Sequence, residues 1–144
     1  MTGDAQAKRL RRINLDVRLG EAAVRTAAEV HAEAVGTLAN ASARYAAVDQ
    51  AYADAAHRLK ETRAALNGRV SKSGSTPGLD LSALEKLQAG WLAAREACTT
   101  LAQRRSVAER ALKDAEAHCD QCRKALETQS HRLKRIRERA HGSH

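Results

Sequence analysis

The fold of this chain is decided by residues 10–66, which read LRRINLDVRLGEAAVRTAAEVHAEAVGTLANASARYAAVDQAYADAAHRLKETRAAL. Apolar residues recur there at every seventh position, and only His31 interrupts the row. A second row of mostly small residues follows three positions after the first. The first row contains Leu10, Val17, Val24, His31, Leu38, Tyr45, Tyr52, Leu59 and Leu66, and the second contains Ile13, Gly20, Ala27, Ala34, Ala41, Val48, Ala55 and Thr62. Two such rows are the a and d positions of a coiled-coil heptad repeat.

Residues 84–140 carry the same repeat. Their a row contains Leu84, Trp91, Cys98, Arg105, Leu112, Cys119, Leu126, Leu133 and Ala140, and their d row contains Leu87, Ala94, Leu101, Ala108, Ala115, Cys122, Gln129 and Ile136. A sustained seven-residue repeat favours left-handed supercoiling of paired helices. We therefore predict an all-α fold of two long helices that form an antiparallel coiled-coil hairpin.

The predicted boundaries follow from capping and turn residues. A single domain is expected over 1–144. Asp4 is a good N-cap for a helix over 5–68, and Asn67-Gly68 is a typical helix stop. Residues 69–80 have loop composition and include Pro77.

A second helix is predicted over 81–139, starting at Asp80 or at Ser82, which begins a capping-box sequence. Residues 140–144 are expected to be a disordered tail, whose last three residues are typical of a cloning remnant.

The register of the hairpin has two solutions. Facing a and d residues in an antiparallel pair have numbers that sum to a constant, and the two rows allow 146 or 153. We prefer 146, because it places Ile136 against Leu10, Leu126 against Gly20 and Trp91 against Ala55, which matches large residues to small ones. The alternative would place Trp91 against Thr62.

Composition limits the function classes. The 144 residues include only 2% aromatics and no Phe, so a thin Ala-rich helix pair is more consistent with the chain than a thick globular core. The net charge of +8 favours an acidic partner: nucleic acid, anionic lipid or an acidic protein surface. No apolar run approaches the roughly 20 residues that span a bilayer. Three cysteines without a signal-peptide pattern indicate the reducing cytoplasm.

Cys119 and Cys122 form a Cys-x-x-Cys pair beside His118, and His31 lies near their level on the opposite helix in either register. Two thiolates and an imidazole are zinc ligands in other proteins. However, three-residue spacing is also what a and d positions require, so core filling is the preferred interpretation and no metal site is predicted. His31 is interpreted as a polar seam residue that fixes the register.

Arg105 occupies an a position, where we expect its side chain to extend to solvent or its guanidinium to stack on Tyr45. Trp91 is interpreted as a core residue near the loop. The sequence contains no nucleophile-base pair, paired-carboxylate pocket or phosphate-binding glycine loop, so catalytic and cofactor-binding residues are not predicted and the chain is expected to be no enzyme.

Two surface features favour a binding role. Basic residues cluster near both ends of the chain, and antiparallel folding brings both clusters to one tip, which carries about all of the net charge while the middle is neutral or acidic. An apolar stripe of Leu15, Leu19, Ala22 and Val30 lies off the seam and indicates partner contact or self-association. The predicted partner-binding residues are Lys8, Arg9, Arg11, Arg12, Leu15, Leu19, Arg132, Lys134, Arg135, Arg137 and Arg139.

A basic antiparallel hairpin of this length, with both ends at one charged tip, resembles the FliJ/SctO (YscO-like) family over residues 5–139. That family forms the central stalk of type III secretion and flagellar export ATPases. The resemblance implies a non-enzymatic, cytoplasmic stalk that is peripheral to the inner membrane through the secretion apparatus. It also implies that the tip binds a hexameric export ATPase and that the remainder binds an export gate protein and export chaperones.

Three alternatives stay open. The same basic tip could bind nucleic acid phosphate, although aromatic residues for base stacking are scarce and no basic region leads into a parallel zipper. A secreted hairpin of the WXG type resembles the chain in fold, but here Gly90 precedes Trp91 and both lie inside the second predicted helix. The third alternative is a scaffold or adaptor protein of another assembly.

Overall fold

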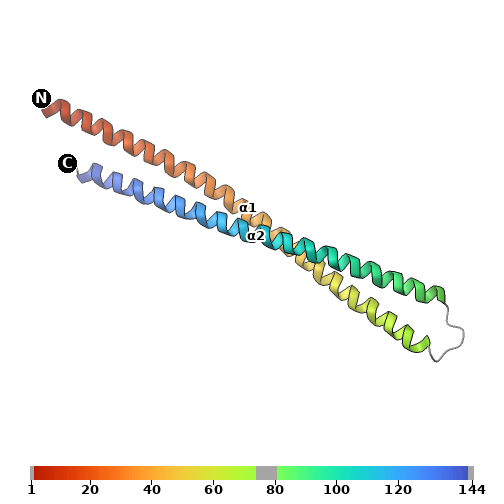
Figure 1. Cartoon of the computed structure of the whole chain (residues 1–144). Coiled ribbons are helices and arrows are strands. Elements are labelled where there is room, and N and C mark those ends of the chain that lie inside the picture. The colour runs from red at the N-terminus through yellow and green to blue at the C-terminus, as the bar shows by residue number, and fades with distance from the viewer. Residues whose placement is uncertain (1, 74–80, 143–144) are drawn as a thin grey trace. The chain divides into compact units, whose positions relative to one another are not determined.

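The computed structural model describes residues 2–73 and 81–142, and both stretches are helical. Helix α1 spans Thr2–Ser73 and helix α2 spans Leu81–Gly142 (Figure 1). The predicted all-α fold of two helices that pack against each other is confirmed. Asp4 lies in the first turn of α1, and Arg139 and His141 lie in the last turn of α2. These charges oppose the helix dipole and stabilise both ends.

The predicted start and end of the first helix are both wrong. Helix α1 begins at Thr2, so Asp4 lies inside its first turn rather than at the N-cap. Helix α1 continues through Asn67 and Gly68 to Ser73, and Gly68 keeps a helical backbone without the left-handed conformation of a C-cap. A glycine within a helix costs only about 1 kcal/mol relative to alanine, so a helix that is already nucleated can continue past it. The part of the predicted loop that covers residues 74–80 lies outside the described residues.

Helix α2 begins at Leu81, as predicted, but extends three residues beyond the predicted end at 139. Residues 140–142 are therefore helical, and the prediction of a disordered tail from residue 140 is wrong for them. Residues 143 and 144 lie outside the described part of the chain.

The chain forms two compact units. Unit 1 comprises Met1–Asn40 and Lys113–His144, and unit 2 comprises Ala41–Leu112. In Figure 1, unit 1 pairs the red-to-orange stretch of α1 with the blue stretch of α2, and unit 2 pairs the yellow-green stretch of α1 with the green-to-cyan stretch of α2. Each unit is thus an antiparallel helix pair. The single domain over 1–144 remains a prediction.

The predicted heptad positions form the interior of both units, except Leu10, which is 50% exposed. Every a and d position of α2 from Leu84 to Ala140 is buried or half-buried, while most of the positions between them are exposed. The most deeply buried residues are small, and no large side chain is fully buried. The buried residues are Ala34, Ala94, Ala108, Ala115, Cys122 and Leu133. The interior is therefore the thin layer expected of paired alanine-rich helices.

The preferred register is wrong, and the alternative is correct. In unit 1, a Cβ added to Gly20 would lie 2.9 Å from Cδ1 of Leu133, so the residue that faces Gly20 is Leu133 rather than Leu126. The numbers 20 and 133 sum to 153. In unit 2, Arg105 Nε lies 2.7 Å from Asp49 Oδ1, which agrees with the same register.

Size matching cannot separate the two registers, because both place large side chains against alanines in several layers. At a sum of 153, Leu38 lies opposite Ala115 in unit 1, and in unit 2 Tyr45 lies opposite Ala108. The charge of Arg105 gives a physical reason for the choice. The guanidinium of Arg105 is part-exposed, and only the register near 153 gives it an ion pair with Asp49.

Gly20 has a packing role that Gly36 and Gly90 lack. Its missing side chain lets α1 approach Leu133 closely, as expected for a small seam residue. Nothing lies within 4 Å of a Cβ added to Gly36 or Gly90, and the structure does not explain these two glycines.

Candidate partner-binding surface

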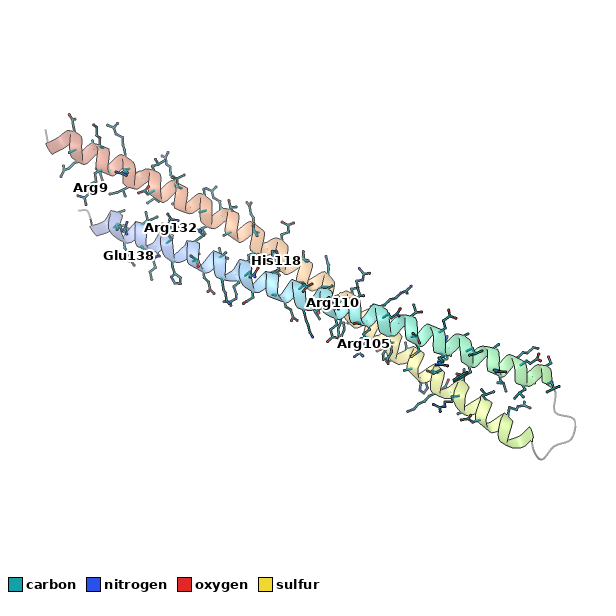
Figure 2. The ribbon with its side chains drawn as sticks, in the orientation of Figure 1. Arg9, Arg105, Arg110, His118, Arg132 and Glu138 are labelled. Atoms are coloured by element: carbon teal, nitrogen blue, oxygen red, sulfur yellow. The ribbon has the colours of Figure 1, made fainter. Side chains whose placement is uncertain are left out.

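Both predicted basic clusters fall in unit 1 and face solvent. Figure 2 shows Arg9 on the N-terminal part of α1, and Arg132 and Glu138 on the C-terminal part of α2. We refer to the nine predicted cations as the basic patch, and every one of them is exposed. The basic patch comprises Lys8, Arg9, Arg11, Arg12, Arg132, Lys134, Arg135, Arg137 and Arg139.

Charge is distributed unevenly within unit 1. Residues 1–18 and 123–139 contain twelve Lys and Arg against four Asp and Glu, a net charge of +8. Residues 19–40 and 113–122, the inner part of unit 1, contain two Lys and Arg against six Asp and Glu, a net charge of −4. Unit 1 therefore has a strongly basic part and an acidic part.

Unit 2 corrects one detail of the predicted charge pattern. It contains eleven Lys and Arg against seven Asp and Glu, a net charge of +4. The predicted neutral or acidic middle therefore agrees with the inner part of unit 1, whereas unit 2 as a whole is basic. The heptad pattern could not reveal this boundary, because it continues unchanged through both units.

Three arginines of the basic patch border a groove between the helices of unit 1. We call it the arginine groove, and Arg132, Arg135 and Arg139 line it from α2 while Asp16 and Leu19 line it from α1. Its full lining is Asp16, Leu19, Gly20, Ala23, Gln129, Arg132, Arg135, Ile136 and Arg139. No carboxylate of the described residues forms an ion pair with Arg132 or Arg135. Their charges are thus available to an anionic partner.

A second, less charged groove continues the first along the same side of unit 1. The two grooves share Ala23 and Gln129, and the second adds Thr26, Val30 and Cys122. We call it the apolar groove; its full lining is Ala23, Thr26, Ala27, Val30, His118, Gln121, Cys122, Ala125 and Gln129. Together the grooves form one surface that changes from basic to apolar.

The opposite side of unit 1 carries an ion pair between the helices. Arg137 Nη2 lies 3.3 Å from Glu21 Oε1, and both side chains are about half exposed. An exposed pair of this kind contributes little to stability. Arg137 therefore differs from Arg132 and Arg135, because part of its hydrogen-bonding capacity is already used.

The predicted apolar stripe is exposed. Leu15 is 55% exposed, Leu19 is 60% exposed and Val30 is 45% exposed. The members of the stripe differ in position. Leu19 lines the arginine groove and Val30 lines the apolar groove, whereas Leu15 and Ala22 line neither.

An apolar site in unit 2 was not predicted from the sequence. Val107 is 69% exposed and lines a groove with Val48, Arg44 and Arg104. A lone valine next to the seam residue Ala108 gives no periodic signal. It is recognisable only when both helices are placed.

The three cysteines and His31 lie on the seam, and His118 lies at its margin. Cys122 is buried, Cys98 and Cys119 are half-buried, and His118 Nε2 lies 3.7 Å from Cys122 Sγ. Within residues 2–73 and 81–142, no three His, Cys, Asp or Glu side chains gather closely enough to hold a metal ion. The buried Cys122 fills the interior, as the core interpretation predicted.

Arg105 reaches the edge of the seam in unit 2. Its guanidinium lies over the ring of Tyr52, 5.2 Å from the centroid, and not over Tyr45 as one of the two expectations had it. The pKa of Arg105 is raised above its ordinary value, first by hydrogen bonding and electrostatic interaction with Tyr45 and then by the charge of Asp49. The aromatic and acidic neighbours thus hold one cation at a position normally reserved for apolar residues.

Trp91 is half-buried at its predicted seam position. Arg95, one turn further along α2, lies 5.5 Å from the centroid of the indole ring. The indole Nε1 is shielded from solvent without a hydrogen-bond partner in the structure.

Neither helix, over its described residues, is both apolar and long enough to cross a membrane. Comparison of the chain with protein-family models, with curated proteins and with solved structures found no match.

Proposed function

We propose that this chain is a non-enzymatic coiled-coil stalk of a bacterial type III secretion apparatus of the Hrp or flagellar type. Its basic patch binds the hexameric export ATPase, and the rest of the chain contacts the export gate protein and export chaperones. The chain would work in the cytoplasm, peripheral to the inner membrane through the apparatus. One observation carries the proposal: cations separated by more than 100 residues in sequence are exposed together in unit 1 and account for the net charge.

A stalk of this kind needs no chemistry of its own. An antiparallel helix pair has no six-fold symmetry, so it contacts the subunits of a hexameric ring unequally. A subunit that binds the pair better in one conformation is shifted toward that conformation, which couples the stalk to the hydrolysis cycle. Charge attraction speeds the encounter, while the exposed Leu15 and Leu19 slow dissociation.

The test is binding of the full chain to a purified hexameric export ATPase at several salt concentrations. Reversing three charges, Arg132→Glu, Lys134→Glu and Arg135→Glu, is expected to weaken binding at least about tenfold at low salt. The remaining binding is expected to depend less on salt, because fewer charge contacts remain to be screened. None of these three side chains forms an ion pair in the described structure, so the variant removes no internal bridge.

The matched control reverses three exposed cations of unit 2: Lys60→Glu, Lys86→Glu and Arg110→Glu. It changes the net charge by the same amount and is expected to leave binding nearly intact. Equal losses for both variants would show that only net charge matters, and the docking role of the basic patch would be rejected. Tight binding of duplex DNA, with a steep logarithmic dependence on salt, would favour the nucleic-acid function instead.

A further inference from the structure

The grooved side of unit 1 is charged at its two ends with opposite signs. Its basic end contains Arg12 and Asp16 of α1 and Arg132, Arg135 and Arg139 of α2, so it is net positive although Asp16 lines the arginine groove beside the three arginines of α2. Arg12 lies seven residues before Leu19, so it shares the face of α1 on which Leu19 lines that groove.

The acidic end lies beyond the apolar groove. Glu33 lies seven residues after Thr26, which lines the apolar groove, and therefore continues the same face of α1. Asp114 lies seven residues before Gln121, which lines the apolar groove from α2. Both carboxylates belong to exposed residues, and neither forms an ion pair within the described part of the chain.

We infer that this side of unit 1 binds a second copy of the chain in an antiparallel, two-fold symmetric arrangement that forms a four-helix bundle. In such an interface the same patch is used twice, so it must be complementary to itself when reversed. The sequence of basic end, apolar centre and acidic end meets this requirement, because reversal places each basic end against the acidic end of the other copy.

The register within unit 1 allows this complementarity to be checked. Because Gly20 faces Leu133, each residue of α2 lies at the level of the α1 residue whose number completes the sum of 153. When Leu19 is placed opposite Val30 of the second copy, Arg135 lies at the same level along the bundle axis as Glu33 of that copy, to within about one helical turn. Asp16 lies at that level too, and the arginines beside it keep this end of the surface net positive. The same placement brings Arg12 within about one turn of Asp114 of the second copy.

The centre of the interface contains residues that allow close packing. Ala23, Thr26 and Ala125 lie between the charged ends, and the exposed Leu19 and Val30 supply apolar area. The stretch from Arg12 to the level of Glu33 is about 30–35 Å long, and two helices are roughly 20 Å wide, so each copy offers on the order of 650 Å². This approaches the roughly 800 Å² per partner of a stable specific interface.

Self-association does not rest on the proposed ATPase docking. The second copy covers the arginine groove, so self-association and docking of an acidic partner on that groove compete. His118, which is labelled in Figure 2, lines the apolar groove and therefore also lies inside the proposed interface with the second copy.

The experiment measures the mass of the full chain by sedimentation equilibrium over a concentration range up to about 100 μM, with cysteines kept reduced. The chain is expected to form a dimer in this range. Arg135→Glu alone and Glu33→Lys alone are each expected to raise the dissociation constant at least about tenfold, because each places like charges opposite one another. The double variant is expected to recover most of the loss, because it restores opposite charges in exchanged positions.

Two control variants change the same charge types on other faces of unit 1. Arg25→Glu and Glu29→Lys carry exposed side chains that line neither groove, and they are expected to leave the dimer unchanged. A monomer at all concentrations would overturn the inference, and so would a double variant no tighter than the single ones. A chain that stays monomeric yet binds an acidic helical peptide on the arginine groove would also overturn it, in favour of a partner of another sequence.

Discussion

Unit 1 and unit 2 are built from the same heptad repeat but differ in the residues that their seams contain. The described seam of unit 1 holds no lysine or arginine, and it includes Gly20, which lets Leu133 pack tightly. The seam of unit 2 accepts Arg105 by surrounding it with Tyr45, Asp49 and Tyr52. The comparison shows that the same heptad repeat can hold a close apolar contact in one unit and a charged side chain with its partners in the other. The surface charges of the two units also differ, and the seam residues do not determine them.

The largest effect is expected from the close contact in unit 1. Leu133 is 6% exposed and is the largest of the buried residues. Leu133→Ala is expected to lower the free energy of unfolding by about 2–3 kcal/mol, near the lower end for buried leucines, because the thin interior can partly collapse. Urea unfolding followed by circular dichroism at 222 nm measures the change. A loss below about 0.5 kcal/mol would show that Leu133 and Gly20 do not form the tight contact described here.

The glycines provide a sharper test of the same contact. Gly36→Ala and Gly90→Ala are each expected to stabilise their unit by about 0.5–1 kcal/mol, because alanine favours the helix and the added Cβ meets nothing. Gly20→Ala is expected to gain less, since its Cβ would lie 2.9 Å from Leu133 and that side chain must move. Thermal unfolding of the three variants gives the comparison. An equal gain at all three positions would place Gly20 outside the tight contact.

The smallest effect is expected from the charged seam of unit 2. Arg105→Lys keeps the positive charge but loses the planar guanidinium that lies over Tyr52, and Asp49→Asn removes the counter-charge. Each variant is expected to lower the urea midpoint slightly, and the double variant is expected to lower it by less than the sum, because the two groups interact. Arg104→Lys, at the exposed neighbouring position, is the control. Additive effects would show that the pair is not coupled.

The fold could be predicted from the sequence because heptad periodicity is a local property. The seam residues of α2 were all identified, and the basic patch was correctly predicted to be exposed and to come from both ends of the chain. The end of α1 was missed because Asn67-Gly68 is a stop signal only when the following residues cannot continue the helix. The grooves could not be predicted, because each is lined by residues from both helices and depends on the register.

The amino-acid sequence by itself determined that this chain forms two helices, which positions make up most of the interior, and where the net charge lies. All three depend only on the order of residues along each helix. Only the tertiary structure decided the register. A shift of one heptad keeps every a residue opposite a d residue, so the repeat alone cannot distinguish the two registers. The choice between 146 and 153 came from contacts across the helices, Gly20 against Leu133 and Arg105 beside Asp49. Those contacts also decided which arginines share a groove with Leu19.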